Sequence, residues 1–285
     1  MRYLIALSLV LTAGWLGLAS PSAARPEPLT LVVMDPLALP LSCPCVEGYA
    51  QRKYEELGKF LEQELGRPVE VVFDESLVVA LKKKTKNRAD LVIGKCSVVQ
   101  HDARKAGVEL RQLAALSGKD GKVTQTGLVV VVAKDPAETV AHLHGYRILF
   151  GPSECDEKHA AALALLKEHQ VPAPAKIETC VACSDGAEKI IELGPTGKTA
   201  TVISSYAAPL LEGCGHIKKG DLRIVGETAP VPFIGAFVNR QLPAADQEAL
   251  QAALRKVGQQ PHLLIALETK LGFVEVPSTV GAKKN

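Results

Sequence analysis

Short apolar runs alternate with longer amphipathic segments along the chain, starting with LTLVVMDP at 29–36. A continuous apolar run of this length is typical of a buried strand, so we predict one there. The next segment, 49–66, places apolar residues at helical spacing and ends in Gly66, which predicts a helix with a glycine stop. The same alternation then predicts strands and helices in turn at 67–75, 76–85, 89–95, 97–107 and 108–116.

A second block repeats the alternation after TGLVVVVAKD, a long run rich in β-branched residues at 126–135. Its strands and helices are predicted in turn at 146–151, 155–170, 175–182, 184–194 and 199–206. Another extended stretch, 222–239, precedes two closing helices at 243–259 and 263–272. Strands separated by helices form mainly parallel sheets with helices on both faces. We therefore predict an α/β fold of two lobes, with mixed or parallel sheets, two crossover strands and a central cleft.

The two extended runs also suggest where the lobes divide. We expect lobe 1 to contain 28–125 and 231–285, and lobe 2 to contain 126–230. Residues 1–24 combine an early arginine, an apolar run and small residues before Arg25, which is typical of a secretory signal peptide. A retained membrane anchor is the alternative, although two glycines and a threonine interrupt the apolar run. We expect a cleaved signal and a periplasmic chain.

Charge excludes one class of partner. The chain has 33 Lys and Arg against 31 Asp and Glu, a formal net charge of +2. Because no basic face with interleaved aromatic residues is present, we expect no nucleic-acid partner. The basic cluster KKKTKNR at 82–88 is interpreted as a solvated helix end.

The seven cysteines carry the candidate chemistry. All fall outside the predicted helix and strand interiors, and most follow the carboxyl end of a strand, where open α/β sheets bind ligands. The spacings in CPC (43–45) and CVAC (180–183) can each place two sulfurs on one soft metal ion. We therefore predict a thiol-lined metal or ligand site from both lobes, comprising Cys43, Cys45, Cys96, Cys155, Cys180 and Cys183.

Two other interpretations of the cysteines remain open. An exported protein normally forms disulfides, and the odd cysteine count would leave at least one thiol unpaired. CVAC in particular can close a disulfide, which would be structural or redox-active. The thiols can also be inert loop residues.

Two predicted helix starts favour anion binding. Ser153 with nearby amides precedes the helix at 155–170, and Ser184 is the expected N-cap of the next helix. Ordinary capping is the alternative explanation. The predicted ligand-binding residues are Ser97, Ser153, Cys155, Ser184 and Asp185. No Ser-His-Asp order, HExxH, P-loop or GxGxxG motif occurs, so we expect a binding protein and not an enzyme.

Five segments carry a resemblance to a known family: YEELGKFLEQELGRPVEVVF, ADLVIGKCSVVQHDARKAGVELRQLA, LHGYRILFGPSECDEKHAAALALLKEHQVP, CVACSDGAEKIIELG and VPFIGAFVNRQLP. Over about residues 29–258 the chain resembles the phosphonate-type periplasmic substrate-binding proteins of ABC importers. The resemblance implies the two-lobed type II periplasmic-binding-protein fold, a small-molecule or ion ligand, an ABC permease or membrane sensor as partner, and a monomer.

The chain departs from the family pattern in the loops. A Ser/Thr-rich anion loop is usual after "F-G", but here Ser153 is followed by Glu154, Cys155 and Asp156, and a fixed acid repels a phosphonate. Cys96 stands where an aromatic residue is frequent. We hypothesise a receptor that captures an oxyanion or a thiophilic species, such as Cu(I), Zn(II) or arsenite, in a cysteine-lined cleft. The alternatives are a metal- or cluster-carrying protein for electron transfer or metal delivery, and a thiol oxidoreductase that uses CVAC.

Overall fold

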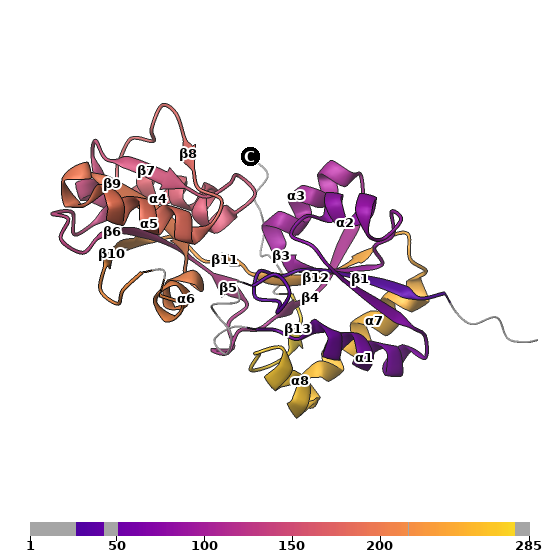
Figure 1. Ribbon diagram of the computed structural model, residues 1–285. Helices are drawn as coiled ribbons and strands as arrows, with labels where there is room; N and C mark the ends of the chain where they lie inside the picture. The colour runs from indigo at the N-terminus through magenta and orange to yellow at the C-terminus, as the bar shows by residue number, and fades with distance from the viewer. Residues whose placement is uncertain (1–26, 43–50, 216, 277–285) are drawn as a thin grey trace, which may run out of the picture.

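The computed structural model describes residues 27–42, 51–215 and 217–276, and it shows two lobes side by side (Figure 1). The predicted signal peptide and the cysteines Cys43 and Cys45 lie outside the described residues. Two segments cross between the lobes and pair with each other in antiparallel fashion, β5 (Thr124–Gln125) and β11 (Val231–Pro232). The predicted two-lobed α/β fold with two crossing segments is confirmed.

Lobe 1 is the part of the molecule built on a six-stranded mixed sheet with the strand order β13-β4-β12-β3-β1-β2. The central strand β1 pairs in parallel with β2 and β3, while β12 pairs in antiparallel fashion with β3 and β4. The strands of lobe 1 are β1 (Leu29–Met34), β2 (Val69–Phe73), β3 (Leu91–Lys95), β4 (Leu110–Leu116), β12 (Ile234–Asn239) and β13 (Phe273–Val274).

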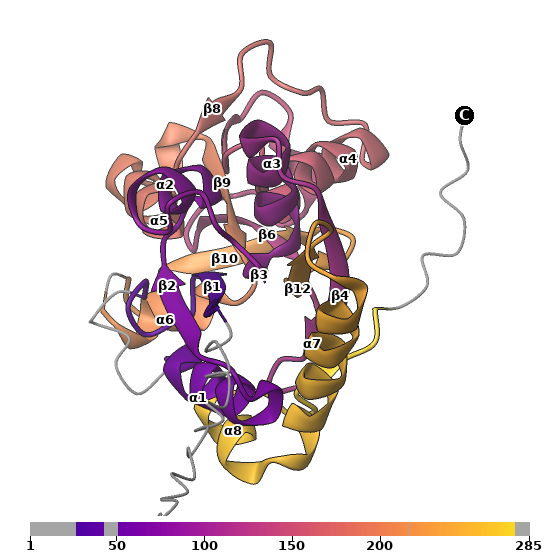
Figure 2. The same cartoon turned by 90° about the vertical axis from the view of Figure 1, so that its right-hand side faces the viewer.

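Helices cover both faces of this sheet (Figures 1 and 2). Successive residues of β1 serve opposite faces: Leu31 and Val33 belong to one core cluster, and Val32 and Met34 to another. This is why the strand reads as a continuous apolar run. The first cluster packs under α1, α7 and α8, and the second under α2 and α3. Their bounds are α1 (Tyr54–Leu65), α2 (Leu77–Lys83), α3 (Cys96–Ala106), α7 (Ala244–Lys256) and α8 (Pro261–Ala266).

Lobe 2 is built on a five-stranded mixed sheet with the order β10-β6-β9-β7-β8. Its strands are β6 (Gly127–Val132), β7 (Arg147–Phe150), β8 (Glu178–Thr179), β9 (Thr199–Ser204) and β10 (Leu222–Glu227). Its helices are α4 (Ala160–Glu168), α5 (Cys183–Leu193) and α6 (Ala207–Gly213), with short 3-10 turns that include η3 (Asp156–Lys158). Two core clusters again fill the two faces, one under α4 and one under α5 and α6.

Several predicted boundaries in lobe 2 are wrong. The helix predicted at 155–170 is a 3-10 turn followed by α4 from Ala160, because His159 adopts non-helical backbone angles (φ −124°, ψ −82°). Of the strand predicted at 175–182, only Glu178–Thr179 form a strand, β8. Helix α5 begins at Cys183 with Ala182 as its N-cap, so Ser184 lies inside the first turn and is not the cap.

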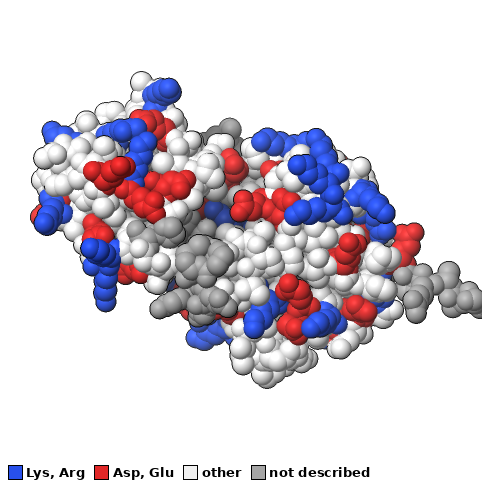
Figure 3. Space-filling view, in the orientation of Figure 1, with Lys and Arg blue, Asp and Glu red and all other residues white. Residues whose placement is uncertain are grey.

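The molecular surface is of mixed charge (Figure 3). Lys82, Lys83, Lys84 and Lys86 are exposed at the end of α2, in agreement with the solvated helix end expected there. Within the described part of the chain, no helix combines the length and the apolar character needed to cross a membrane.

Candidate functional site

A cavity of about 420 Å³ lies between the lobes, and we call it the interlobe cavity. Lobe 1 contributes Met34 at the end of β1, Lys95 at the end of β3 and Val98 in α3. Lobe 2 contributes the loop after β7, the start of α5 and the segment after β9, including Cys155, Cys183, Ser184, Tyr206 and Cys214. The cavity therefore occupies the carboxyl ends of strands from both sheets, where α/β folds bind ligands.

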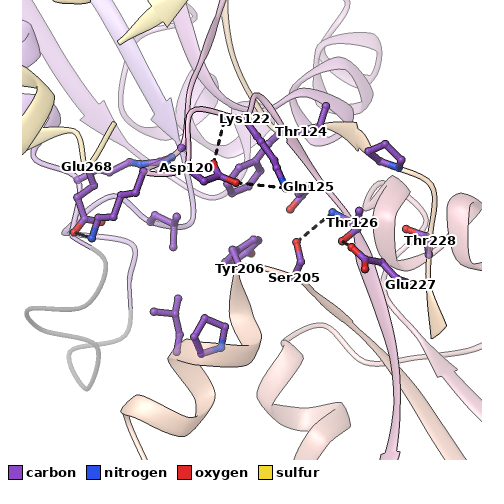
Figure 4. Close-up of a pocket in the computed structure, with 18 residues that line it drawn as sticks. Asp120, Lys122, Thr124, Gln125, Thr126, Ser205, Tyr206, Glu227, Thr228 and Glu268 are labelled. Atoms are coloured by element: carbon purple, nitrogen blue, oxygen red, sulfur yellow. Dashed lines mark hydrogen bonds and ion pairs between the residues drawn. The ribbon is translucent and has the colours of Figure 1, made fainter. Parts of the chain in front are cut away.

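A second cavity of about 960 Å³ adjoins the crossing segments, and we call it the hinge cavity. Figure 4 shows Thr124, Gln125 and Thr126 along one wall, with Ser205 and Tyr206 facing them. Tyr206 lines both cavities, so the two spaces meet at this side chain. Its ring stacks on Phe233 with the ring centroids 5.1 Å apart, which joins lobe 2 to the start of β12.

A buried polar cluster of lobe 1 lies at the wall of the hinge cavity, which one of its members, Arg52, lines. Asp35, with 0% of its side chain exposed, accepts hydrogen bonds from Arg52 Nη1 at 2.7 Å and from Tyr54 Oη at 2.5 Å. Burial by itself lowers the pKa of Arg52, but Asp35 raises it above the ordinary value. Because the guanidinium also lies 5.8 Å from the Phe233 ring centroid, this cluster supports the aromatic contact with Tyr206.

An ion pair links the two lobes beside the interlobe cavity. Lys95 Nζ, at the end of β3, lies 2.6 Å from Glu157 Oε1 in η3, and the two side chains are 7% and 0% exposed. Ser204 Oγ donates a second hydrogen bond to the same carboxylate oxygen at 2.6 Å. The pair is thus a buried contact between a cation of lobe 1 and an anion of lobe 2.

Both members of this pair are ionised. Burial alone would raise the pKa of Glu157, but Lys95 and Ser204 hold it below the ordinary value. Burial likewise favours neutral Lys95, yet its neighbours Tyr206 and Glu157 raise the pKa of this lysine overall. The Tyr206 hydroxyl is kept protonated, because burial raises its pKa.

The described cysteines divide into two groups. Cys155 and Cys183 line the interlobe cavity, as does Cys214, which the sequence-based site did not include. Among the described cysteines, Cys96 and Cys180 are absent from the lining of both cavities. Cys96 packs in the core cluster under α2 and α3, where burial raises the pKa of its thiol to about 12. All five described cysteines are free thiols.

The residues predicted to bind a ligand are also scattered. Cys155 and Ser184 line the interlobe cavity, whereas Ser97 Oγ accepts a hydrogen bond from the Asp156 amide at 3.4 Å across the lobes. Ser153 is exposed and bonds to Glu154, and Asp185 accepts a hydrogen bond from the amide of Ala182. The structure thus brings two of the five together.

A preformed metal site is not found in the described part of the chain. There, no group of three or more His, Cys, Asp or Glu side chains lies close enough together to hold an ion. Cys43 and Cys45 fall outside the described residues, so the six-cysteine site stays a prediction.

Sequence reasoning missed three polar residues beside the two cavities. Lys95, Glu157 and Tyr206 were not singled out, although each lies at or just after a strand end. The rule that ligands bind at the carboxyl ends of strands singled out the cysteines, and it applies equally to Lys95, Glu157 and Tyr206. Lys95 directly precedes Cys96, and Glu157 follows Cys155 by two positions.

Two α/β lobes around a cavity at the strand ends are the architecture of the two-lobed periplasmic binding proteins. The sequence profile of the family described as "ABC transporter, phosphonate, periplasmic substrate-binding protein" matches residues 48–277. The chain belongs to this family. Its members are substrate-binding components of transporters, as expected from the resemblance. A sequence comparison with curated proteins finds no match.

Solved structures share the fold at low sequence identity. XAC2383 from Xanthomonas citri, solved with ATP bound, has a TM-score of 0.65 and 16% identity over 88% of this chain and 92% of that one. A binding-protein component of an ABC phosphonate transporter from Pseudomonas aeruginosa has a TM-score of 0.63 and 12% identity over 87% and 81%. PhnD1 from Prochlorococcus marinus, solved with methylphosphonate, has a TM-score of 0.61 and 13% identity over 89% and 94%.

Proposed function

We propose that the protein captures a small thiophilic ligand in the interlobe cavity and presents it to an ABC importer or a membrane sensor. The observation that carries this proposal is the lining of the cavity, which combines residues from both lobes with three free thiols, Cys155, Cys183 and Cys214. A ligand held there contacts both lobes, so binding favours the closed arrangement.

The movement is proposed to be a hinge at the crossing segments. Lobe 1 would comprise 28–125 and 231–285, and lobe 2 would comprise 126–230. The short pairing of β5 with β11 supports this division, because it is the only two-stranded sheet in the described chain and it joins the two larger sheets. A few residues at the ends of elements are enough to absorb such a motion.

The chemistry of the lining favours a soft ligand. Apolar side chains including Met34, Val98 and Leu211 share the wall with the three thiols, and sulfur ligands prefer soft species. Arsenite is a suitable probe, since each thiol that reacts with As(OH)₃ forms one As–S bond, and the thiol proton leaves with the displaced hydroxide as water. The three thiols line the same cavity but do not form a preformed triad, so we expect binding to require a local rearrangement.

The test is a titration of the mature chain, purified without chelator, with arsenite and with Zn²⁺ by calorimetry. We expect saturable binding of at least one probe and its loss in the double variant Cys155→Ser/Cys183→Ser. Cys180→Ser is the matched control, because this cysteine is absent from the lining of the cavity and should leave binding unchanged.

Two results would count against the proposal. If the double variant binds the probe with unchanged affinity, Cys155 and Cys183 do not take part in binding. If Cys180→Ser loses affinity, the binding thiols lie outside the interlobe cavity. The metal content of the same preparation tests the alternative of a metal- or cluster-carrying protein, which requires a resident ion or a coloured centre before any probe is added.

A further inference from the structure

The interlobe cavity has no surplus of positive charge. Its described lining contains two cations, Lys95 and Lys158, and two carboxylates, Glu75 and Glu154. Glu157 adds a third carboxylate directly behind Lys95, at 2.6 Å from its ammonium. Lys158 Nζ is already used as a donor to the carbonyl of Val181 at 3.2 Å. A small oxyanion entering the cavity would therefore meet more negative than positive charge.

Glu157 makes the contacts that an anionic ligand would make. It comes from lobe 2, it is fully buried, and one carboxylate oxygen receives Lys95 from lobe 1 and Ser204 from β9 at 2.6 Å each. Two strong, charge-assisted hydrogen bonds thus converge on an oxygen between the lobes. The other oxygen, Oε2, is buried without a hydrogen-bond partner among the described residues.

The main chain fixes this carboxylate in place. The carbonyl of Glu157 packs against the α-carbon of Gly127, at the start of β6, so closely that a side chain there would collide with it. Gly127 in turn donates its amide to Thr228 Oγ1 at 2.8 Å. Glu157 is therefore held against the start of β6 and is not a mobile surface acid.

Three backbone donors beside the cavity are also occupied. The amide of Ala182, before α5, donates to Asp185 Oδ2 at 3.2 Å. The amide of Cys155 donates to the carbonyl of Pro152 at 2.9 Å, and that of Asp156 to Ser97 Oγ at 3.4 Å. Because backbone amides are common donors to bound anions, their use inside the protein leaves fewer donors for an anion in the cavity.

We infer that Glu157 is a specificity-determining residue, a built-in anion that neutralises Lys95 and restricts the interlobe cavity to ligands without net negative charge. The inference rests on the proposed function in taking this cavity as the ligand site. It sets the chain apart from the Prochlorococcus relative that was solved with methylphosphonate. A neutral species such as As(OH)₃ fits the restriction, whereas sulfate and methylphosphonate do not.

The test is a gain of anion binding. Mature wild-type protein and Glu157→Ser are titrated with sulfate and methylphosphonate by calorimetry. We expect wild type to bind neither saturably at millimolar concentration, and Glu157→Ser to bind at least one of them about tenfold or more tightly, because the ammonium of Lys95 is uncovered. Glu154→Ser, which removes a carboxylate of the lining but leaves Lys95 paired, is the matched control and should not show this gain.

A second variant keeps the inference falsifiable if Glu157→Ser does not fold. Lys95→Met/Glu157→Gln removes both charges without leaving either one buried alone, and it should stay unable to bind anions. Micromolar binding of sulfate or methylphosphonate by wild type, lost in this double variant, overturns the inference. A folded Glu157→Ser that gains no anion binding overturns it as well.

The two proposals fail in different ways. Wild type that binds arsenite and sulfate equally well refutes the restriction but leaves the thiol-lined receptor intact. Wild type that binds neither arsenite nor Zn²⁺, with Glu157→Ser gaining sulfate, supports the role of Glu157 and refutes the thiophilic ligand.

Discussion

At the scale of single residues, two buried ion pairs dominate the region between the lobes. Asp35 and Arg52 brace the hinge cavity from lobe 1, and Lys95 and Glu157 link the lobes. A buried pair is costly to form, because both ions lose water, but leaving one partner alone in the interior is more costly still. The stability lost when one member is removed therefore measures the cost of an unpaired buried charge more than the attraction between the two ions.

Asp35→Ala should be strongly destabilising. It leaves Arg52, 3% exposed, without its carboxylate and removes the acceptor of Tyr54. We expect a loss of about 3–5 kcal/mol in the free energy of unfolding, measured by urea denaturation. Asp246→Ala, which removes the partly exposed pair with Arg67, should cost about 0–1 kcal/mol. Equal losses in the two variants would contradict the importance of burial.

The Lys95–Glu157 pair should make stability depend on pH. The folded-state pKa of Glu157 lies below its ordinary value of 4.5, so the contribution is present above pH 4.5 and is lost as pH falls through the folded-state pKa. The pKa of Lys95 is raised above 10.5, so its contribution is complete below pH 10.5 and is lost only at higher pH. Thermal unfolding between pH 2 and 7 should therefore show a steeper acid loss of Tm in wild type than in Lys95→Met/Glu157→Gln. Parallel curves would refute this prediction.

At the scale of elements, the sequence predicted what local patterns determine. Apolar runs identified β1 and β6, because both strands are buried on both faces. Boundaries failed where tertiary contacts decided them: Glu157 and Lys158 turn inward, and this replaced the first turn of a predicted helix by η3. The ion pair joins residues 62 positions apart, and no local pattern of the sequence indicates such a pairing.

The contact between β6 and η3 should tolerate no side chain at Gly127. Gly127→Ala places a methyl group against the Glu157 carbonyl and the Thr228 side chain, so we expect a loss of about 1–3 kcal/mol from overpacking, measured by urea denaturation. Gly107→Ala is the comparison, because its added carbon meets nothing within 4 Å. Its only cost is the strain of alanine at the positive φ of 68°. That variant should cost about 1 kcal/mol. A Gly127→Ala protein as stable as wild type would show that η3 can shift.

At the scale of the whole molecule, several contacts between the described residues hold the lobes together, among them the hydrogen bond from the Asp156 amide to Ser97. Two others are the Lys95–Glu157 pair and the stacking of Tyr206 on Phe233. We expect Lys95→Met/Glu157→Gln to open the lobes, seen as a larger radius of gyration in small-angle X-ray scattering, while Lys59→Met, which removes an exposed pair within α1, leaves it unchanged. An unchanged radius in the double variant would mean that the ion pair does not set the angle between the lobes.

The distribution of the thiols has a consequence for the order of events during uptake. Cys155, Cys183 and Cys214 all belong to lobe 2, although the cavity they line is bounded by both lobes. If the proposed ligand bonds to sulfur, lobe 2 alone can hold it while the lobes are apart, and lobe 1 would close over it afterwards. Release would then proceed in two stages, a fast separation of the lobes followed by slow breakage of the bonds between the ligand and sulfur. A receptor of this kind would keep its ligand when the lobes separate, and a transporter would have to extract the ligand actively from lobe 2.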